Sequence, residues 1–392
     1  MKANATTPHH NNEIVKSQRI VFLYGAPFDL GWGRSQSLCK GFLEKDHEVF
    51  YIEHPVSIRF LFSNKSTVSK KTRGKLHIIK LFGLPVRRFP FLNRLNITLI
   101  KYQIKRAIDK DFLTPNILWI YDVADINIVN LFFAEKRVYD CADDRLSRIT
   151  EQFGEKYARN FQEKENQIMK DVDHIFVVTE RLLQNVQLRL GKKENSKFSI
   201  LNNGMDFDYF YNFRDSQTSI PSALQELNSP IIGYVGTITY WLDLDLIISV
   251  AHDNPEYSFV LIGPLRDGMR PISSCKSIFY LEPVPYKEVP KYIKAMDVCM
   301  LPFKPIESVL NADSLKILQY FSLGKPVVST IKPPIREYEG LIWTGADDKG
   351  FATAIRAALR ESTGLSQQRI KIARDRSWQS ICEKALSRIY ES

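Results

Sequence analysis

The sequence is poor in the residues that cross-link a chain or anchor it in a membrane. Its 392 residues include only five cysteines, which are scattered and form no CxxC pair. They are Cys39, Cys141, Cys275, Cys299 and Cys382. This odd, dispersed set argues against a disulfide framework or a zinc site and is typical of reduced thiols in a cytoplasmic protein. No apolar run reaches the ~18 residues that a membrane-spanning helix requires, so we expect no transmembrane helix.

The first 18 residues lack the apolar region of a secretion signal. They read MKANATTPHHNNEIVKSQ and are mostly polar. We interpret residues 1–18 as a flexible tail and expect a cytoplasmic protein.

Negative charge is missing from one long stretch of the chain. Between His54 and Ile108 there is no Asp or Glu, but there are 13 Lys and Arg, more than the formal net charge of +10 of the whole chain. Apolar residues interleave with these cations: Phe60, Leu61, Phe62, Phe82, Leu84, Phe89, Phe91 and Leu92. We predict that segment 54–108 contacts an anionic membrane surface, and a solvated basic face is the alternative. Nucleic acid would also explain the charge, but no nucleic-acid-binding motif is present, so we expect no such partner.

Short apolar strands alternate with helical patterns along the whole chain. The chain opens with strand 20–24, a glycine-rich loop, helix 34–44 and strand 48–52, and this rhythm restarts at residue 230. Such alternation predicts two parallel α/β domains, each a doubly wound sheet. We place them at 19–210 and 230–376, joined by a polar linker at 211–229 and followed by a C-terminal helix at 377–392. In the first domain we expect one long helix over residues 145–170.

The stretch NADSLKILQYFSLGKPVVST, residues 311–330, predicts a loop, a short helix and a buried strand. Asp313 or Ser314 would cap the helix start, and Gly324 would end it. Lys316 and Gln319 share one face. A lysine beside the free N–H groups of a first helical turn suits a phosphate. The alternative is an ordinary surface lysine.

Three carboxylates in the segment DCADDRLS, residues 140–147, follow a predicted strand. Ligands bind at that edge of open α/β sheets, so one of these carboxylates could be a general base. The alternative is that Asp143 or Asp144 caps the following helix. The loop at Gly31, Trp32, Gly33 and Arg34 contains only a GxG, which allows a nucleotide contact, an acceptor contact or simply a turn.

Several of these segments resemble the GT-B class of glycosyltransferases over about residues 20–389. The resemblance rests on GYVG at 233–236, VLIGP at 260–264, VPYKEVPKYIKAMDVCMLPF at 284–303 and LKILQYFSLGKPVVST at 315–330. NGMD at 203–206 is similar to the interdomain hinge, and SWQSICEKAL at 377–386 to the closing helix. Within that class, ADSLKILQY and VYDCADDRLS resemble the xanthan-type glucuronosyltransferases, and the N-terminal region resembles exopolysaccharide and teichuronic acid glycosyltransferases.

The resemblance implies two Rossmann-like domains facing across a cleft, with the C-terminal helix crossing back to the first domain. It implies an inverting, metal-independent transferase with a nucleotide-diphospho-sugar donor, such as UDP-glucuronic acid or UDP-glucose, and no cofactor. The acceptor would be a polyprenyl-diphosphate-linked saccharide at the cytoplasmic face of the inner membrane. Asp143 would be the general base, with Asp140 as the second candidate, and the loop 31–34 would face the acceptor. The implied donor-binding residues are Gly236, Thr237, Gly263, Val284, Pro285, Tyr286, Phe303, Asp313, Ser314, Lys316 and Gln319.

Two features depart from many related enzymes. Gln319 stands where many retaining members carry Glu, which favours inversion. The loop 237–242 has no Arg/Lys pair, so Lys316 would be the principal cation for the diphosphate. Two DxD patterns, at Asp206–Asp208 and Asp243–Asp245, are interpreted as structural. A sugar-nucleotide epimerase and a non-catalytic nucleotide-sugar-binding protein are the alternative functions.

Overall fold

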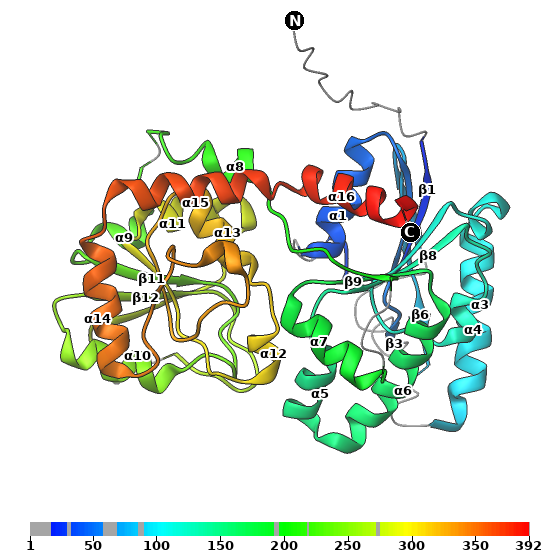
Figure 1. The fold of residues 1–392 in the computed structure, drawn as a ribbon, viewed down its shortest axis with the longest axis horizontal. Coiled ribbons are helices and arrows are strands. Elements are labelled where there is room, and N and C mark those ends of the chain that lie inside the picture. The colour runs from blue at the N-terminus through cyan, green and yellow to red at the C-terminus, as the bar shows by residue number, and fades with distance from the viewer. Residues whose placement is uncertain are drawn as a thin grey trace, which may run out of the picture.

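The chain folds into two α/β domains that lie side by side (Figure 1). The computed structural model describes residues 17–29, 33–57, 69–84, 90–191, 196–217, 219–271 and 275–391. Gly31 and Trp32, most of the predicted tail, and residues 58–68 and 85–89 of the basic segment lie outside the described residues.

The first domain is built on an eight-stranded sheet in the order β10-β9-β8-β7-β1-β2-β5-β4. Its strands are parallel except for the β4–β5 pair. They are β1 (Arg19–Gly25), β2 (Glu48–Glu53), β4 (Ser69–Arg73), β5 (Leu76–Lys80), β7 (Ile117–Ile120), β8 (Lys136–Cys141), β9 (His174–Val177) and β10 (Phe198–Ile200). A separate short pair joins β3 (Val56–Ser57) to β6 (Phe82–Gly83).

Helices cover both faces of this sheet, because β1 buries alternate residues on opposite sides. Ile20 and Phe22 pack with α1 (Arg34–Glu44) and the C-terminal helix α16 (Trp378–Glu391). Val21 and Leu23 belong to the core of the other face. The helices that pack on that face are α3 (Asn93–Ala107), α4 (Ile126–Val129), α6 (Glu155–Asp171) and α7 (Glu180–Arg189). Short 3-10 turns lie at Pro90–Leu92 and Lys110–Leu113.

The second domain has a parallel six-stranded sheet in the order β13-β12-β11-β14-β15-β16. The strands are β11 (Ile231–Val235), β12 (Ser258–Ile262), β13 (Ile278–Leu281), β14 (Val298–Leu301), β15 (Val327–Ser329) and β16 (Trp343–Thr344). The helices are α8 (Phe207–Tyr211), α9 (Ser222–Gln225), α10 (Leu244–Asp253), α11 (Val289–Ala295), α12 (Glu307–Leu310), α13 (Leu315–Ser322), α14 (Asp348–Leu359) and α15 (Thr363–Asp375). Further 3-10 turns span Tyr286–Glu288 and Arg336–Tyr338.

The chain crosses between the domains twice. The first crossing lies upstream of the predicted linker at 211–229, because Phe207 and Phe210 of α8 already pack in the core of the second domain. The second crossing lies at residues 376–377: α15 packs on α13, and the next helix, α16, packs on α1 of the first domain. The C-terminal helix therefore crosses back to the first domain, which confirms that part of the predicted fold.

The long helix expected over residues 145–170 is wrong as a single helix. Gly154, with a φ of 82°, separates α5 (Arg145–Phe153) from α6. Glycine adopts this left-handed conformation without the steric cost that a side chain would add. The break lets α5 pack against α12 of the second domain, while α6 stays on the first sheet.

Among the described residues, no helix combines the length and the apolar composition needed to cross a membrane.

Candidate active site

The start of α13 carries the lysine that the sequence singled out. Ser314 is the residue before the first helical turn, but its side chain makes no capping hydrogen bond. Lys316 is partly buried and its ammonium lies 5.5 Å from the centre of the Tyr234 ring. In the part of the chain that the structure describes, this ammonium has no hydrogen-bond or ion-pair partner. Burial lowers the pKa of Lys316 to about 8, because desolvation disfavours the charged ammonium.

Two glycines at the ends of adjacent strands make room for Lys316. Gly236 follows β11, and a Cβ at this position would lie 2.1 Å from Lys316 Cε. Gly263 follows β12, and a Cβ there would lie 2.1 Å from the Gly236 carbonyl oxygen. Both have φ values in the left-handed range, at 150° and 144°. The backbone at this sheet edge can therefore lie against the lysine only with glycine at both positions.

A cavity of about 310 Å³ lies between the domains. It brings together seven residues predicted from the sequence: Gly33, Arg34, Asp143, Phe303, Asp313, Ser314 and Lys316. Asp143 comes from the loop after β8 of the first domain, and Lys316 from the second domain. The candidate base and the candidate phosphate cation thus line the same space from opposite domains, as the carboxyl ends of two facing sheets allow.

Asp143 is accessible and has a cationic neighbour. Its side chain is 42% exposed, and its Oδ2 lies 3.5 Å from Arg148 Nη2. The guanidinium of Arg148 in turn lies 5.6 Å from the centre of the Trp241 ring, in the second domain. The Nε of Arg148 is buried without a hydrogen-bond partner among the described residues. Asp143, Arg148 and Trp241 all line the cavity, so a second cation stands beside the candidate base.

Asp140, the second candidate base, is engaged differently. It is fully buried in β8, where it accepts from Arg34 Nε at 2.9 Å and Arg34 Nη2 at 2.9 Å. Trp119 Nε1 donates to the same carboxylate at 3.2 Å. Both oxygens of this carboxylate are thus engaged by buried donors. The geometry therefore favours Asp143 over Asp140 as the accessible base.

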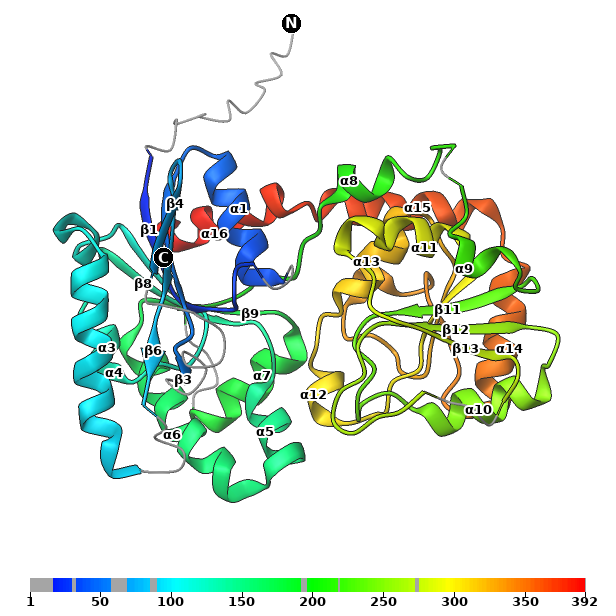
Figure 2. The same ribbon diagram turned by 180° about the vertical axis from the view of Figure 1, so that it is seen from behind.

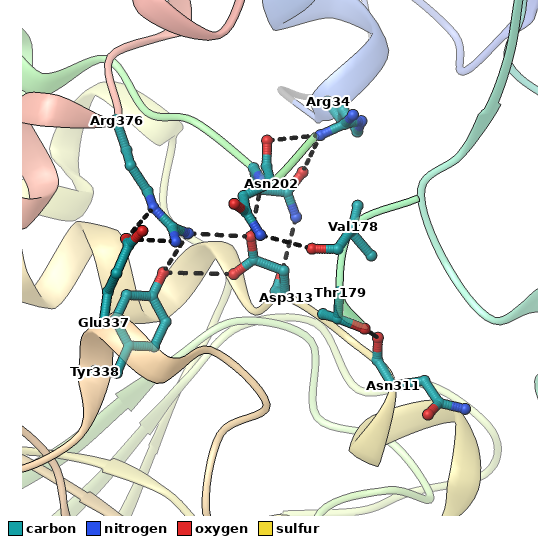
Figure 3. A network of polar contacts seen from close by, with 10 residues as sticks. Arg34, Val178, Thr179, Asn202, Asn311, Asp313, Glu337, Tyr338 and Arg376 are labelled. Atoms are coloured by element: carbon teal, nitrogen blue, oxygen red, sulfur yellow. Dashed lines mark hydrogen bonds and ion pairs between the residues drawn. The ribbon is translucent and has the colours of Figure 1, made fainter. Parts of the chain in front are cut away.

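Arg34 also begins a buried polar network that crosses the domain boundary (Figure 3). Its Nη1 donates to the Asn202 carbonyl oxygen and to Asn203 Oδ1, at 3.1 and 3.0 Å. Asn203 donates its backbone N–H to Asp313 Oδ2 at 2.7 Å and its Nδ2 to the Asp313 carbonyl oxygen at 2.7 Å. Arg376, at the second crossing, pairs with Asp313 at 3.5 Å. Both chain crossings are thus tied to Asp313, in the loop before α13.

Asp313 therefore holds the loop before α13 rather than leaving a free carboxylate in the cavity. Its side chain is fully buried, and Tyr338 completes the ring of partners. Burial raises the pKa of Asp313, while Arg376 and the Asn203 N–H act in the opposite direction. Its partners leave little capacity for a ligand.

A second cavity of about 310 Å³ adjoins the first on the side of the first domain. The two cavities share Tyr121, Ala142, Asp143 and Arg148. The second is lined mainly by aromatic, acidic and basic side chains, including Tyr24, His54, Asp122, Tyr139, Asp140 and Arg145. Tyr24 has a φ of 62° at the end of β1, a conformation that is uncommon for a bulky residue. Asp143 thus lines both of these adjoining cavities, which have about the same volume.

Helix α5, which carries the cavity residue Arg148, also contacts the second domain. Asp144 caps it by accepting from Ser147 N–H at 3.0 Å, and it also accepts from Asn311 Nδ2 at 2.7 Å. Of the two caps considered, the structure thus assigns Asp144. Two turns on, Glu151 accepts from the Ser308 N–H at 3.0 Å and from the Tyr240 hydroxyl at 3.1 Å. Asn311, Ser308 and Tyr240 belong to the second domain, so α5 is held against it by polar contacts.

Of the other predicted donor residues, Phe303 lines the main cavity and meets the Tyr234 ring edge-on. The remaining ones do not line it. Val284 and Pro285 precede the turn that begins at Tyr286. Tyr286 packs against Phe210 and is hydrogen-bonded by Gln319, and burial raises its pKa. Gly236, Thr237, Gly263, Val284, Pro285, Tyr286 and Gln319 are absent from the residues that line the cavity itself.

Several cavity residues were not found from the sequence. Arg148 lies on a predicted helix directly after Asp143, and this position could have identified it. Trp241 and Ser308 carried no local signal, and Asn203 was noted only as part of the hinge motif. Their positions depend on how the two domains face each other.

The DxD patterns have structural partners. Asp243 caps α10 by accepting from Leu246 N–H at 3.1 Å, and Asp206 lies 3.4 Å from Lys40 of α1. Within the described ranges, no group of three or more His, Cys, Asp or Glu side chains could hold a metal ion.

Comparison with known proteins places the second domain in a known family. Residues 229–361 match the family model described as glycosyl transferases group 1. Over 214 residues the chain is 25% identical to TuaH of Bacillus subtilis (strain 168), named as a teichuronic acid biosynthesis glycosyltransferase. That match covers 52% of each protein, so the chain spans about half the length of this curated relative.

Solved structures match nearly the whole chain. Sucrose-phosphate synthase from Thermosynechococcus elongatus superposes with a TM-score of 0.68 at 13% identity, covering 95% of this chain and 98% of that one. Anabaena Alr3699/HepE in complex with UDP and glucose has a TM-score of 0.65 at 15% identity, covering 96% and 100%. Trehalose-6-phosphate synthase, from a study of glycosyl transfer with retention, has a TM-score of 0.67 at 11% identity, covering 96% and 99%. Residues 229–361 of this chain are therefore a group 1 glycosyltransferase domain, and the chain as a whole has the GT-B fold.

Proposed function

We propose that this protein transfers a sugar from a nucleotide-diphospho-sugar to a saccharide acceptor. The observation that carries the proposal is the interdomain cavity in which Lys316, an unpaired cation among the described residues, and Asp143, an accessible carboxylate, both line the walls. A transferase needs a cation for the leaving diphosphate and a base for the acceptor hydroxyl. The family match and the names of the similar proteins support the same reaction class.

The donor's diphosphate would bind at the start of α13. Lys316 and the first N–H groups of this helix supply positive charge at one point. Arg148, held over Trp241, adds a second cation from the first domain. We propose that it substitutes for the basic pair that the loop 237–242 lacks. The nucleoside would extend toward Val284, Pro285 and Tyr286, with Gln319 near the sugar or phosphate.

The acceptor sugar would enter the second cavity. Its tyrosine, carboxylate and arginine side chains suit the many hydroxyl groups of a saccharide. We propose a polyprenyl-diphosphate-linked saccharide, because the basic segment 54–108 suits an anionic membrane surface. The described part of the loop 31–34, Gly33 and Arg34, faces the main cavity next to this entrance. Work at the cytoplasmic face of the inner membrane, in surface polysaccharide biosynthesis, remains a prediction.

In the proposed reaction the acceptor oxygen attacks the anomeric carbon of the donor sugar. The new bond forms as the bond from that carbon to the phosphate oxygen breaks, and Asp143 takes the acceptor proton. The negative charge that develops on the leaving diphosphate is stabilised by Lys316, Arg148 and the α13 N–H groups, which act more strongly on the transition state than on the bound donor. We propose inversion at the anomeric carbon, because Gln319 stands where many retaining enzymes carry Glu and Asp143 is an accessible carboxylate that lines the cavity. A metal ion is not needed in this scheme.

The test is a transfer assay with the full chain. Radiolabelled UDP-glucuronic acid, UDP-glucose, UDP-N-acetylglucosamine and GDP-mannose are each incubated with a bacterial lipid extract that contains polyprenyl-linked saccharides. We expect one donor to label the lipid fraction, with EDTA causing no loss, and Asp143→Asn to abolish the labelling. Nuclear magnetic resonance of the product reports the anomeric configuration. Conversion of a donor to another sugar nucleotide without acceptor would instead indicate an epimerase and overturn the proposal.

A further inference from the structure

Helix α3 and the turn before it present a row of exposed apolar side chains. Phe91, Leu95 and Tyr102 are 79%, 61% and 59% exposed, whereas Ile100 and Ile104 are buried against the first sheet. The three exposed residues follow each other at spacings of four and seven residues, which places them on one side of the helix. α3 thus has two apolar faces, and one of them is in contact with the domain core.

The cations of α3 differ from the other described cations of the basic segment. On strands β4 and β5, Lys71, Arg73 and Lys80 all lie within 4 Å of the Asp29 carboxylate. Lys70 and Lys75 pair with Asp109 and Asp46. By contrast, the described residues offer no carboxylate partner to the four cations of α3, which are Arg94, Lys101, Lys105 and Arg106. Among the described cations of the segment, those without a carboxylate partner are therefore concentrated on the helix with the exposed apolar row.

The position of α3 leaves this face open. Figures 1 and 2 show α3 at the edge of the first domain farthest from the second domain. A flat partner bound along α3 would therefore not cover the cavity between the domains. Nucleic acid would use the cations but not the apolar row, and a second copy of this strongly basic face would repel the first.

We propose that α3 is the membrane-docking element of this protein and binds anionic lipid. Phe91, Leu95 and Tyr102 would enter the boundary between headgroups and acyl chains, and Arg94, Lys101, Lys105 and Arg106 would contact the lipid phosphates. This assigns the membrane contact to one helix rather than to the whole basic segment. It depends on no step of the proposed sugar transfer.

The experiment is vesicle flotation of the full chain. Vesicles of phosphatidylcholine alone are compared with an equal mixture of phosphatidylcholine and phosphatidylglycerol, at about 0.1 M and about 0.5 M salt. We expect binding only to the mixed vesicles, weaker at high salt. The double variant Leu95→Ser/Tyr102→Ser and the charge variant Arg94→Gln/Lys101→Gln/Lys105→Gln/Arg106→Gln should each lower the partition coefficient at least about tenfold, since each interfacial cation contributes about fivefold. Leu188→Ser, which removes a 76%-exposed residue of α7, should have no effect.

Three results would overturn the proposal. The first is no flotation of the wild type with anionic vesicles. The second is flotation that both α3 variants leave unchanged, which would place the contact elsewhere. The third is a wild-type dimer in analytical ultracentrifugation that the Leu95→Ser/Tyr102→Ser variant converts to monomer, which would make this face a contact between copies. Nucleotide-sugar binding by the α3 variants, measured by calorimetry, stays at the wild-type value in all cases if they are folded.

Discussion

Replacement of Lys316 by methionine tests the proposed phosphate site by removing one charged group. Methionine keeps most of the length and the apolar stem of lysine, so the contact with Gly236 and Tyr234 is retained while the charge is lost. A lysine about 4 Å from a phosphate, at an effective dielectric constant of about 20, contributes about 4 kcal/mol. Part of this attraction already stabilises the bound donor and does not lower the barrier. Removal of one such stabiliser typically lowers kcat by ~100-fold to ~1000-fold, and we predict ~100-fold or more here.

The same substitution should stabilise the free protein. The folded-state pKa of Lys316, about 8, lies below its ordinary value of 10.5 because burial disfavours the ammonium. The charged form therefore costs stability at pH values below about 8, and this cost disappears as the pH rises from about 8 to 10.5. After a discount for its partial exposure, we expect Lys316→Met to raise the free energy of unfolding by ~2 kcal/mol at pH 7. The gain should fade toward pH 10.5.

The assays are steady-state transfer across pH and urea unfolding. In the wild type, kcat/KM for the donor should fall as the pH rises above about 8, because the neutral amine no longer attracts the diphosphate. Lys316→Met should lack this alkaline limb. Lys349→Met, at an exposed position of α14, is the matched control and should change neither quantity. Wild-type kcat in Lys316→Met, or an alkaline limb that persists in it, would refute the assignment.

Four further substitutions test the rest of the site. Asp143→Asn should lower kcat by ~100-fold or more while the donor Kd, measured by calorimetry, stays within about twofold; a large change in Kd would contradict a role as base. Arg148→Met should weaken donor binding about tenfold, and equal binding would show that Lys316 acts alone. Arg376→Met leaves Asp313 buried without its guanidinium partner, so the free energy of unfolding in urea should fall by ~3 kcal/mol. A fall below about 1 kcal/mol would mean that the ion pair contributes little. Glu151→Ala removes the contacts of α5 with Ser308 and Tyr240. We therefore expect double electron–electron resonance to show a wider distribution of interdomain distances, which Glu151→Gln partly restores. An unchanged distribution would mean that α5 does not hold the two domains together.

Local sequence patterns were enough to predict some elements of this fold. Helix 34–44 was predicted with the bounds that α1 has, because its apolar face and the glycine before it are local features. The break at Gly154 was missed, since a single glycine inside a helical pattern costs only ~1 kcal/mol and is often tolerated. Here the contacts of α5 with the second domain favour the break, and they are not visible in the sequence.

Only the site residues next to a recognisable strand end or helix start could be predicted from the sequence. Asp143 and Lys316 each follow a recognisable strand or begin a recognisable helix, so the carboxyl-edge rule brought them together. The pairing of Asp140 with Arg34 joins residues 106 positions apart, and that of Asp313 with Arg376 spans 63. Such pairs depend on domain packing, as does the contact of Arg148 with Trp241.

The basic segment shows the same limit. Its charge could be counted from the sequence, but the sequence did not show which of the described cations have a carboxylate partner. Asp29 lies outside the segment and collects three of its cations in space. The face of α3 became recognisable only when these neighbours were known.

The most direct test of the central claim is a calorimetric titration of the purified protein with UDP-glucuronic acid, UDP-glucose, UDP-N-acetylglucosamine and GDP-mannose, with Lys316→Met alongside. We expect one of these nucleotide-sugars to bind and the substitution to weaken this binding at least about tenfold. If none binds to the folded wild-type protein, with or without acceptor lipid, the claim that the interdomain cavity holds a nucleotide-diphospho-sugar is contradicted.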